Sequence, residues 1–187
     1  EDYYAFQILK RMMGDFIPER DAILNHPHLQ YNNLHKFLGE MADICEYDTH
    51  YFSYSDCGLI GGYGSTIDVS SVFVPVAILK SFRRTNSFIS DAELYRSRNK
   101  YYNDLLNAES PAAVSNEIAR QITYAGRRVH RSEVAKRVSF LDNSFLEKTY
   151  SKWLWDCELA LTFYGPTFMM ARHYGIYRAH TNDTNQI

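Results

Sequence analysis

Cysteine is scarce in this sequence, with only Cys45, Cys57 and Cys157 among 187 residues. An odd number at wide spacing does not build a disulfide framework, and no two of them have the close spacing of a zinc site. The pattern predicts buried thiols in a reducing compartment.

Long apolar runs and an excess of charge are also missing. No apolar stretch approaches the roughly 20 residues that a membrane-spanning helix needs, so we expect no direct membrane span. The net charge is −2, from 20 Lys and Arg against 22 Asp and Glu. Nothing global therefore drives the chain onto nucleic acid or anionic lipid, and nucleic acid is not an expected partner.

Apolar and aromatic residues, in contrast, are present in amounts typical of a folded core. Hydrophobic residues make up 45% of the chain, which includes 15 Tyr and 11 Phe. A chain of this length can bury a full core as one domain. The sequence therefore predicts a folded, aromatic-rich protein.

The spacing of apolar residues places the predicted strands and helices in separate blocks. The predicted elements are a helix over 2–13, a short helix around 34–41, strands over 44–54 and 59–67, a helix that Asp68 caps and Pro75 bends, four successive regions of helix from Ser90 onward, and a half-buried strand over 158–164. This order indicates an α+β fold in which helices cover one face of an antiparallel sheet. Three strands are few for independent stability.

The helix boundaries after residue 89 carry clear local signals. Ser90 and Glu93 have the spacing of a capping box. Ser110 followed by Pro111 combines a cap with a proline at the first helical position. Gly126 is suited to end that helix in a left-handed conformation.

The same part of the chain carries a family resemblance. The residues concerned are Glu93–Lys100, Asn107–Ser110, Ile118–Gln121, Tyr124–Val129, Trp153–Asp156 and Gly165-Pro166. In order and spacing they resemble the carboxy-terminal half of mitochondrial processing peptidase and respiratory complex III core subunits, which are pitrilysin-like metallopeptidases. The resemblance is stronger to the catalytic-type (beta or core 1) subunit. It implies a carboxy-terminal domain over 1–166, incomplete at its amino end, and an aromatic-basic arm and tail over 167–187.

The zinc motif of that family, H-x-x-E-H, is absent from the sequence. The nearest approach is His130 to Glu133, but Val134 stands where the second histidine is needed, and a helix cap explains the pair as well. We therefore expect no catalytic, metal-binding or cofactor-binding residue in this chain. Zinc would belong to an amino-terminal half that the resemblance implies.

Two other patterns have simple interpretations. His26-Pro27-His28 lacks an evident third metal ligand and reads as a solvated loop. The glycines at 58, 61, 62 and 64 match neither a dinucleotide fingerprint nor a phosphate loop. In a strand they are typical of close packing.

The candidate site residues are those of a partner interface. Arg127 and Arg128 follow a helix end, where they either contact an acidic partner or satisfy the helix dipole and surface ion pairs. Tyr174, Tyr177 and Arg178 follow the last predicted strand, and such residues are enriched at protein interfaces.

The resemblance implies a structural core subunit of complex III on the matrix side of the mitochondrial inner membrane. Its partners would be a second core-type subunit, its own amino-terminal half and the membrane subunits of the complex. The alternative is part of the zinc-dependent catalytic subunit of the processing peptidase. A nucleic-acid module is a third and weaker hypothesis.

Overall fold

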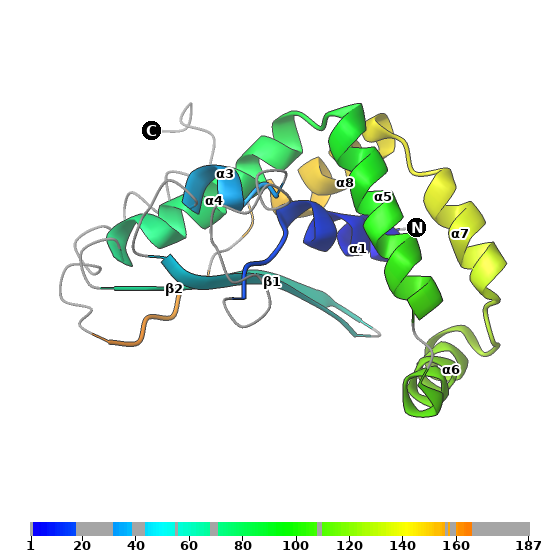
Figure 1. The fold of residues 1–187 in the computed structure, drawn as a ribbon. Coiled ribbons are helices and arrows are strands. Elements are labelled where there is room, and N and C mark those ends of the chain that lie inside the picture. Colours follow the sequence, from blue (N-terminus) through cyan, green and yellow to red (C-terminus); the bar gives the residue numbers. More distant parts are fainter. Residues whose placement is uncertain are drawn as a thin grey trace.

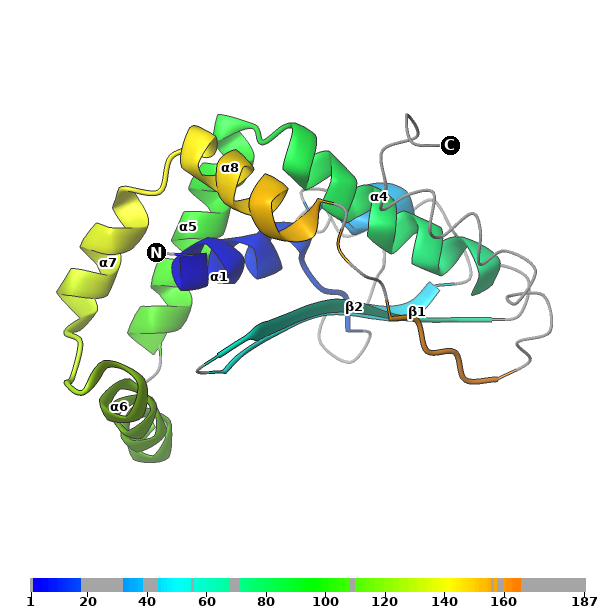
Figure 2. The same cartoon turned by 180° about the vertical axis from the view of Figure 1, so that it is seen from behind.

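The computed structural model describes residues 2–17, 32–38, 44–54, 56–67, 71–107, 110–155, 157 and 160–165. Its elements are α1 (Asp2–Met13), α3 (His35–Leu38), β1 (Ile44–Ser53), β2 (Gly58–Thr66), α4 (Phe73–Ser87), α5 (Asp91–Asn107), α6 (Pro111–Ala125), α7 (Arg131–Ser139) and α8 (Asn143–Leu154). Helices α1, α3 and α4 cover one face of the β1–β2 hairpin, and α6 lies apart from them (Figures 1 and 2). The predicted α+β architecture is confirmed.

The hairpin is antiparallel and closes between the two predicted strands. Tyr51 pairs with Ile60 and Phe52 with Leu59. The amide of Tyr54 donates a hydrogen bond of 2.9 Å to the carbonyl of Cys57 across the turn. In the described parts of the chain these two strands form the whole sheet.

Two glycines of β2 let helix α4 approach the strand closely. A Cβ atom at Gly62 would lie 2.7 Å from Cγ2 of Ile78, and one at Gly64 would lie 2.5 Å from Cγ1 of Val74. At Gly61 a Cβ would meet nothing within 4 Å. The packing interpretation of these glycines is confirmed for the two that face α4.

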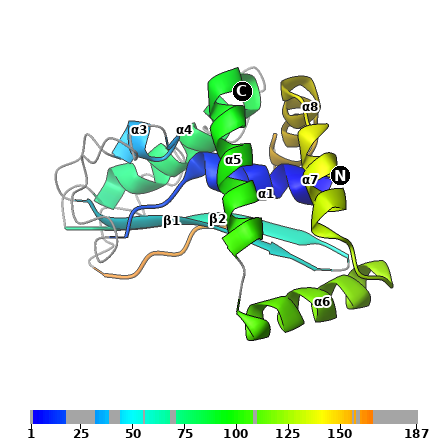
Figure 3. The ribbon, with the colours of Figure 1, turned by 45° about the vertical axis from the view of Figure 1, so that its right-hand side comes forward.

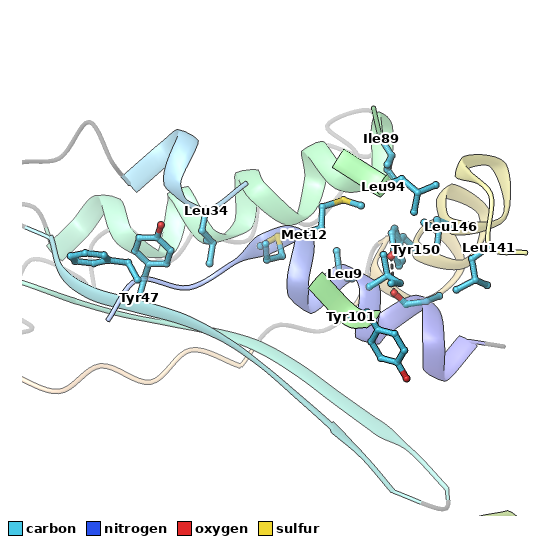
Figure 4. Close-up of a cluster of buried hydrophobic side chains, with 14 of the residues drawn as sticks. Leu9, Met12, Leu34, Tyr47, Ile89, Leu94, Tyr101, Leu141, Leu146 and Tyr150 are labelled. Carbon is cyan, nitrogen blue, oxygen red and sulfur yellow. Dashed lines mark hydrogen bonds between the residues drawn. The ribbon is translucent and has the colours of Figure 1, made fainter. Parts of the chain in front are cut away.

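Helix α1 supplies the centre of the hydrophobic core. Its fully or almost fully buried residues are Ala5, Ile8, Leu9, Met12 and Met13. Leu34, Tyr47, Leu146 and Tyr150 surround them (Figure 4). The hydroxyl of the buried Tyr150 donates a hydrogen bond of 2.8 Å to the carbonyl of Ala5. This bond joins α8 to α1, whose bonded residues are 145 positions apart in the sequence.

Helix α4 differs from its prediction at Pro75. The helix begins at Phe73, so Pro75 lies in its first turn, where the missing N–H removes no intrahelical bond and gives no reason for a bend. The predicted cap, Asp68, lies outside the described residues. Within the helix Leu79 is buried, whereas Val76 and Phe82 are half-buried.

The third strand predicted over 158–164 was wrong for its described part. Residues 160–164 belong to no strand, although Leu161 and Phe163 are half-buried and Ala160, Thr162 and Tyr164 are exposed. Alternating polarity reports which side of an extended segment faces the protein. It does not supply the neighbouring backbone that a strand requires.

The expectation of buried thiols was also wrong. Cys45 and Cys57 are exposed and Cys157 is half-buried. Cys45 lies where the β1 register shifts between Ile44 and Glu46, and Cys57 lies beside the hairpin turn. Strand bulges and turns expose side chains whatever their polarity.

Candidate partner interface between helices α6 and α7

Helix α6 forms where the sequence predicted it and both of its ends are well defined. The Ser110 hydroxyl accepts a hydrogen bond of 3.1 Å from the amide of Ala113, and Pro111 occupies the first turn. Gly126 ends the helix with φ of 67°, in the left-handed conformation. Residues 126–130 then connect α6 to α7, and we call this segment the elbow.

Arg127 is held within the molecule by an ion pair. Its guanidinium donates two hydrogen bonds to the carboxylate of Glu133, at 2.9 and 2.7 Å. Arg137, one turn further along α7, donates to the same carboxylate at 2.7 Å. Hydrogen bonds from Arg127 and then Arg137 lower the pKa of Glu133 to about 2. The carboxylate therefore remains charged throughout the physiological range.

Two further interactions fix the elbow. The side-chain oxygen of Gln121 accepts a hydrogen bond of 2.8 Å from the amide of Val129. Nδ1 of His130 accepts one of 3.2 Å from the amide of Ser132 and so caps α7. His130 and Glu133 are thus occupied as a helix cap and an arginine ligand. The cap interpretation is confirmed for His130, whereas the Glu133 side chain takes no part in the cap.

Arg128 and Arg120 behave differently from Arg127. Both side chains are exposed, and neither forms an ion pair with any residue that the structure describes. Of the five predicted interface residues, only Arg127 and Arg128 can be placed. Tyr174, Tyr177 and Arg178 lie outside the described residues.

Helix α6 buries none of the side chains that the structure describes in it. Val114 and Ile118 are half-buried, whereas Ile122 is 53% exposed. Figure 3 shows the helix along its length, below the other helices and crosswise to α5. The elbow holds it in this position.

Sequence reasoning missed a polar cluster that joins α3, α4 and α5. Glu93 is only 7% exposed, and its carboxylate accepts hydrogen bonds from Lys36, from the Ser90 amide and, at 2.9 Å, from Arg84. The side chain of Asn33 accepts from Arg84 at 2.5 Å and donates to Thr85. The capping-box spacing identified Glu93 but gave no signal for its distant partners.

Burial and hydrogen bonding act on Glu93 in opposite directions. Burial raises the pKa of its carboxyl group, but the hydrogen bonds from Lys36, the Ser90 amide and Arg84 outweigh that effect. The pKa of Glu93 therefore lies below its ordinary value. The hydrogen bonds of the cluster link α3, α4 and α5.

The remaining histidines with described positions are not gathered into a site. His35 is buried, its ring 6.4 Å from that of Tyr47. Nδ1 of His50 lies 3.4 Å from the carboxylate of Asp48 on the hairpin. Within the described ranges, no three His, Cys, Asp or Glu side chains are arranged to hold a metal ion. His26 and His28 lie outside those ranges.

None of the helices in the described part of the chain is both long and apolar enough to cross a membrane.

Comparison with known proteins finds sequence relatives that are mitochondrial proteins. The beta subunit of the mitochondrial processing peptidase of Dictyostelium discoideum is 26% identical over 170 residues, which cover 88% of this chain and 34% of that protein. Subunit 1 of the mouse cytochrome b-c1 complex is 29% identical over 155 residues, which cover 78% of this chain and 32% of that protein. The sequence relatives of this chain are thus beta subunits of the mitochondrial processing peptidase and subunit 1 of the cytochrome b-c1 complex. No family model matches the sequence.

The fold of this chain has a counterpart among solved structures. A chain in the structure of complex III2 from Candida albicans with Inz-5 bound superposes with a TM-score of 0.82 at 19% identity, over 98% of this chain and 43% of that one. The resemblance noted on Glu93–Lys100 and Tyr124–Val129 is confirmed by the sequence relatives. The chain spans about a third of the length of these two relatives.

Proposed function

We propose that this chain is part of a structural core subunit of mitochondrial complex III, on the matrix side of the inner membrane. The observation that carries the proposal is the match to a chain of complex III2 over nearly the whole of this chain. Subunit 1 of the mammalian cytochrome b-c1 complex is among its sequence relatives. The sequence of this chain lacks the H-x-x-E-H motif. The chain would act as a scaffold without catalytic residues of its own.

The proposed partners follow from that role. They are a second core-type subunit, the amino-terminal half of the same protein and the membrane subunits of complex III. Residues 1–166 would form the carboxy-terminal processing-peptidase-like domain, and 167–187 an arm that contacts a neighbour. Arg127, Arg128, Tyr174, Tyr177 and Arg178 would belong to the partner interface.

Native gel separation of mitochondrial complexes, followed by mass spectrometry of each slice, tests this proposal. The peptides of this chain should co-migrate with cytochrome b in solubilised membranes. Recovery of the chain only in fractions without cytochrome b would contradict the proposal. Matrix proteins released by sonication serve as the control for incomplete separation.

The second candidate is part of the catalytic subunit of the mitochondrial processing peptidase. Beta subunits of that enzyme match up to 88% of this chain, in organisms as distant as Neurospora crassa and Dictyostelium discoideum. In this role zinc would be held outside this chain. The complex that is immunopurified through a tag on the chain should then contain zinc and cleave a mitochondrial presequence peptide. A chelator-treated sample of the same complex is the control. Absence of both zinc and cleavage would exclude this candidate.

A further inference from the structure

The charge of this chain is concentrated unevenly, and the excess of positive charge lies around the elbow. Residues 117–137 carry six Arg or Lys against two Glu, a net charge of +4, in a chain whose overall net charge is −2. Two of the six, Arg127 and Arg137, share Glu133. Arg120, Arg128 and Lys136 are exposed and form no ion pair with a described residue.

One of these cations, Arg120, lies on α6 beside its exposed face, and Arg128 follows the end of the helix. At helical spacing, Ala112, Ala119 and Thr123 are opposite the half-buried Val114 and Ile118, and all three are exposed. Side chains this small allow another backbone to approach closely. Arg120 and Ile122 flank this face, so that it offers a cation on one side and an exposed apolar group on the other.

The elbow makes this surface rigid before anything binds. Gly126, the Gln121–Val129 hydrogen bond, the paired hydrogen bonds of Arg127 to Glu133 and the His130 cap each restrict the connection between α6 and α7. A surface that is already ordered loses less entropy on binding than a mobile one. The positive charge attracts acidic groups and speeds their encounter.

We propose that α6 and the elbow form a rigid docking surface for an acidic segment of a partner protein, with Arg120 and Arg128 as contact residues and Arg127 as a positioning residue. This inference rests on the proposed role of Arg127 and Arg128 in a partner interface. It assigns different tasks to these two neighbouring arginines. Charge complementarity selects an acidic protein segment as the occupant.

The test measures binding of the full chain to a labelled amphipathic peptide with glutamates on one face and leucines on the other. The double variant Arg120→Glu/Arg128→Glu should weaken binding about tenfold, since two attractive contacts become repulsive. The matched control, Lys80→Glu/Arg83→Glu, reverses two exposed charges on α4 and should leave affinity within about twofold. Equal loss in both variants would overturn the proposal, as would equal binding of a twin peptide with lysines in place of glutamates.

A second measurement separates positioning from contact. Arg127→Ala should weaken peptide binding without changing the slope of affinity against salt, and should speed hydrogen exchange at the Val129 amide. Arg128→Ala should reduce the salt slope and leave that exchange rate unchanged. Identical behaviour of the two variants would overturn the division of roles.

Two other occupants are outcomes of the same experiment. Tighter, Arg120- and Arg128-dependent binding to phosphatidylglycerol vesicles than to the acidic peptide would assign the surface to a membrane and overturn the proposal. Self-association of the chain with the same arginine dependence would assign it to a second copy. If the peptide fails to bind while the chain still co-migrates with cytochrome b, only the docking inference fails and the proposed function stands.

Discussion

Helix α1 and helix α6 have similar lengths but are held in place by different forces. Five side chains of α1 are fully or almost fully buried, and β1, α4, α5, α7 and α8 all pack on it. Helix α6 buries none of its described side chains and depends on its ends, through a serine cap, a left-handed glycine and the arginine–glutamate contacts of the elbow. Burial stabilises the first helix, whereas local hydrogen bonds and ion pairs orient the second. The comparison indicates that α1 maintains the fold and α6 presents a surface.

The largest expected difference comes from truncating one apolar side chain in each helix. Leu9→Ala removes buried contacts at the centre of the core and should lower the free energy of unfolding by about 3 kcal/mol. Ile122→Ala, on the exposed part of α6, should change it by less than about 0.5 kcal/mol. Urea unfolding followed by circular dichroism measures both. Equal losses would mean that α6 is packed as tightly as α1.

The buried carboxylate of Glu93 gives the next largest effect. Glu93→Gln leaves Lys36 and Arg84 without their shared anion and should lower stability by about 3 kcal/mol at neutral pH. Glu147→Gln is the matched control, because Glu147 is only half-buried and forms no ion pair with a described residue. Urea unfolding at pH 7 compares the two. If Glu93→Gln lowers the free energy of unfolding no more than Glu147→Gln does, the cluster does not contribute to stability.

The loss of stability caused by Glu93→Gln should disappear at acidic pH. The folded-state pKa of Glu93 lies below the value for the unfolded chain, about 4.3. Its contribution is therefore complete above about pH 4.3 and decreases as the pH falls through the folded-state pKa. Unfolding curves of the natural chain and of Glu93→Gln should converge on acidification. A constant difference in stability between the two proteins across the acid range would contradict the lowered pKa of Glu93.

A matched pair of glycines tests the contact between the hairpin and α4. Gly62→Ala forces a methyl group against Ile78 and should lower stability by about 2 kcal/mol. Gly61→Ala, one residue away on the open face, meets no atom and should be close to neutral. Thermal unfolding monitored by circular dichroism distinguishes them. A neutral Gly62→Ala would show that α4 can move away from the strand at little cost.

The smallest expected effect on stability belongs to the elbow. Arg127→Ala breaks exposed hydrogen bonds to Glu133 and should leave the melting temperature nearly unchanged, since exposed ion pairs contribute little. Hydrogen exchange at the Val129 amide should nevertheless become faster, because the segment loses one of its restraints. Slower or unchanged exchange would show that the other contacts suffice to fix the elbow.

Local signals in the sequence predicted local structure well. Ser110, Pro111 and Gly126 marked both ends of α6, and Ser90 with Glu93 marked the start of α5. Each signal acts within one helical turn and needs no knowledge of the rest of the fold. The family resemblance also rested on residues in these helices, and it was confirmed.

Contacts between distant segments could not be predicted in the same way. Nothing near Glu93 in the sequence points to Lys36, which is 57 residues away. The adjacent Arg127 and Arg128 looked equivalent until the fold brought Glu133 within reach of only one of them. Residues 160–164 had the alternation of a strand, but among the described residues they pair with no strand. In each case the deciding partner comes from tertiary structure.

The close approach of α4 to β2 also sets how the helix is aligned along the strand. Val74 meets Gly64 and Ile78 meets Gly62, so the helix and the strand run in opposite directions at this contact. Two residues of a strand rise about 6.7 Å and four residues of a helix about 6 Å, so the two repeats coincide over one step. Sliding the helix by one turn would place a branched side chain over Ile60 or Thr66 instead of a glycine. The positions of the two glycines therefore permit a single alignment of helix α4 along strand β2.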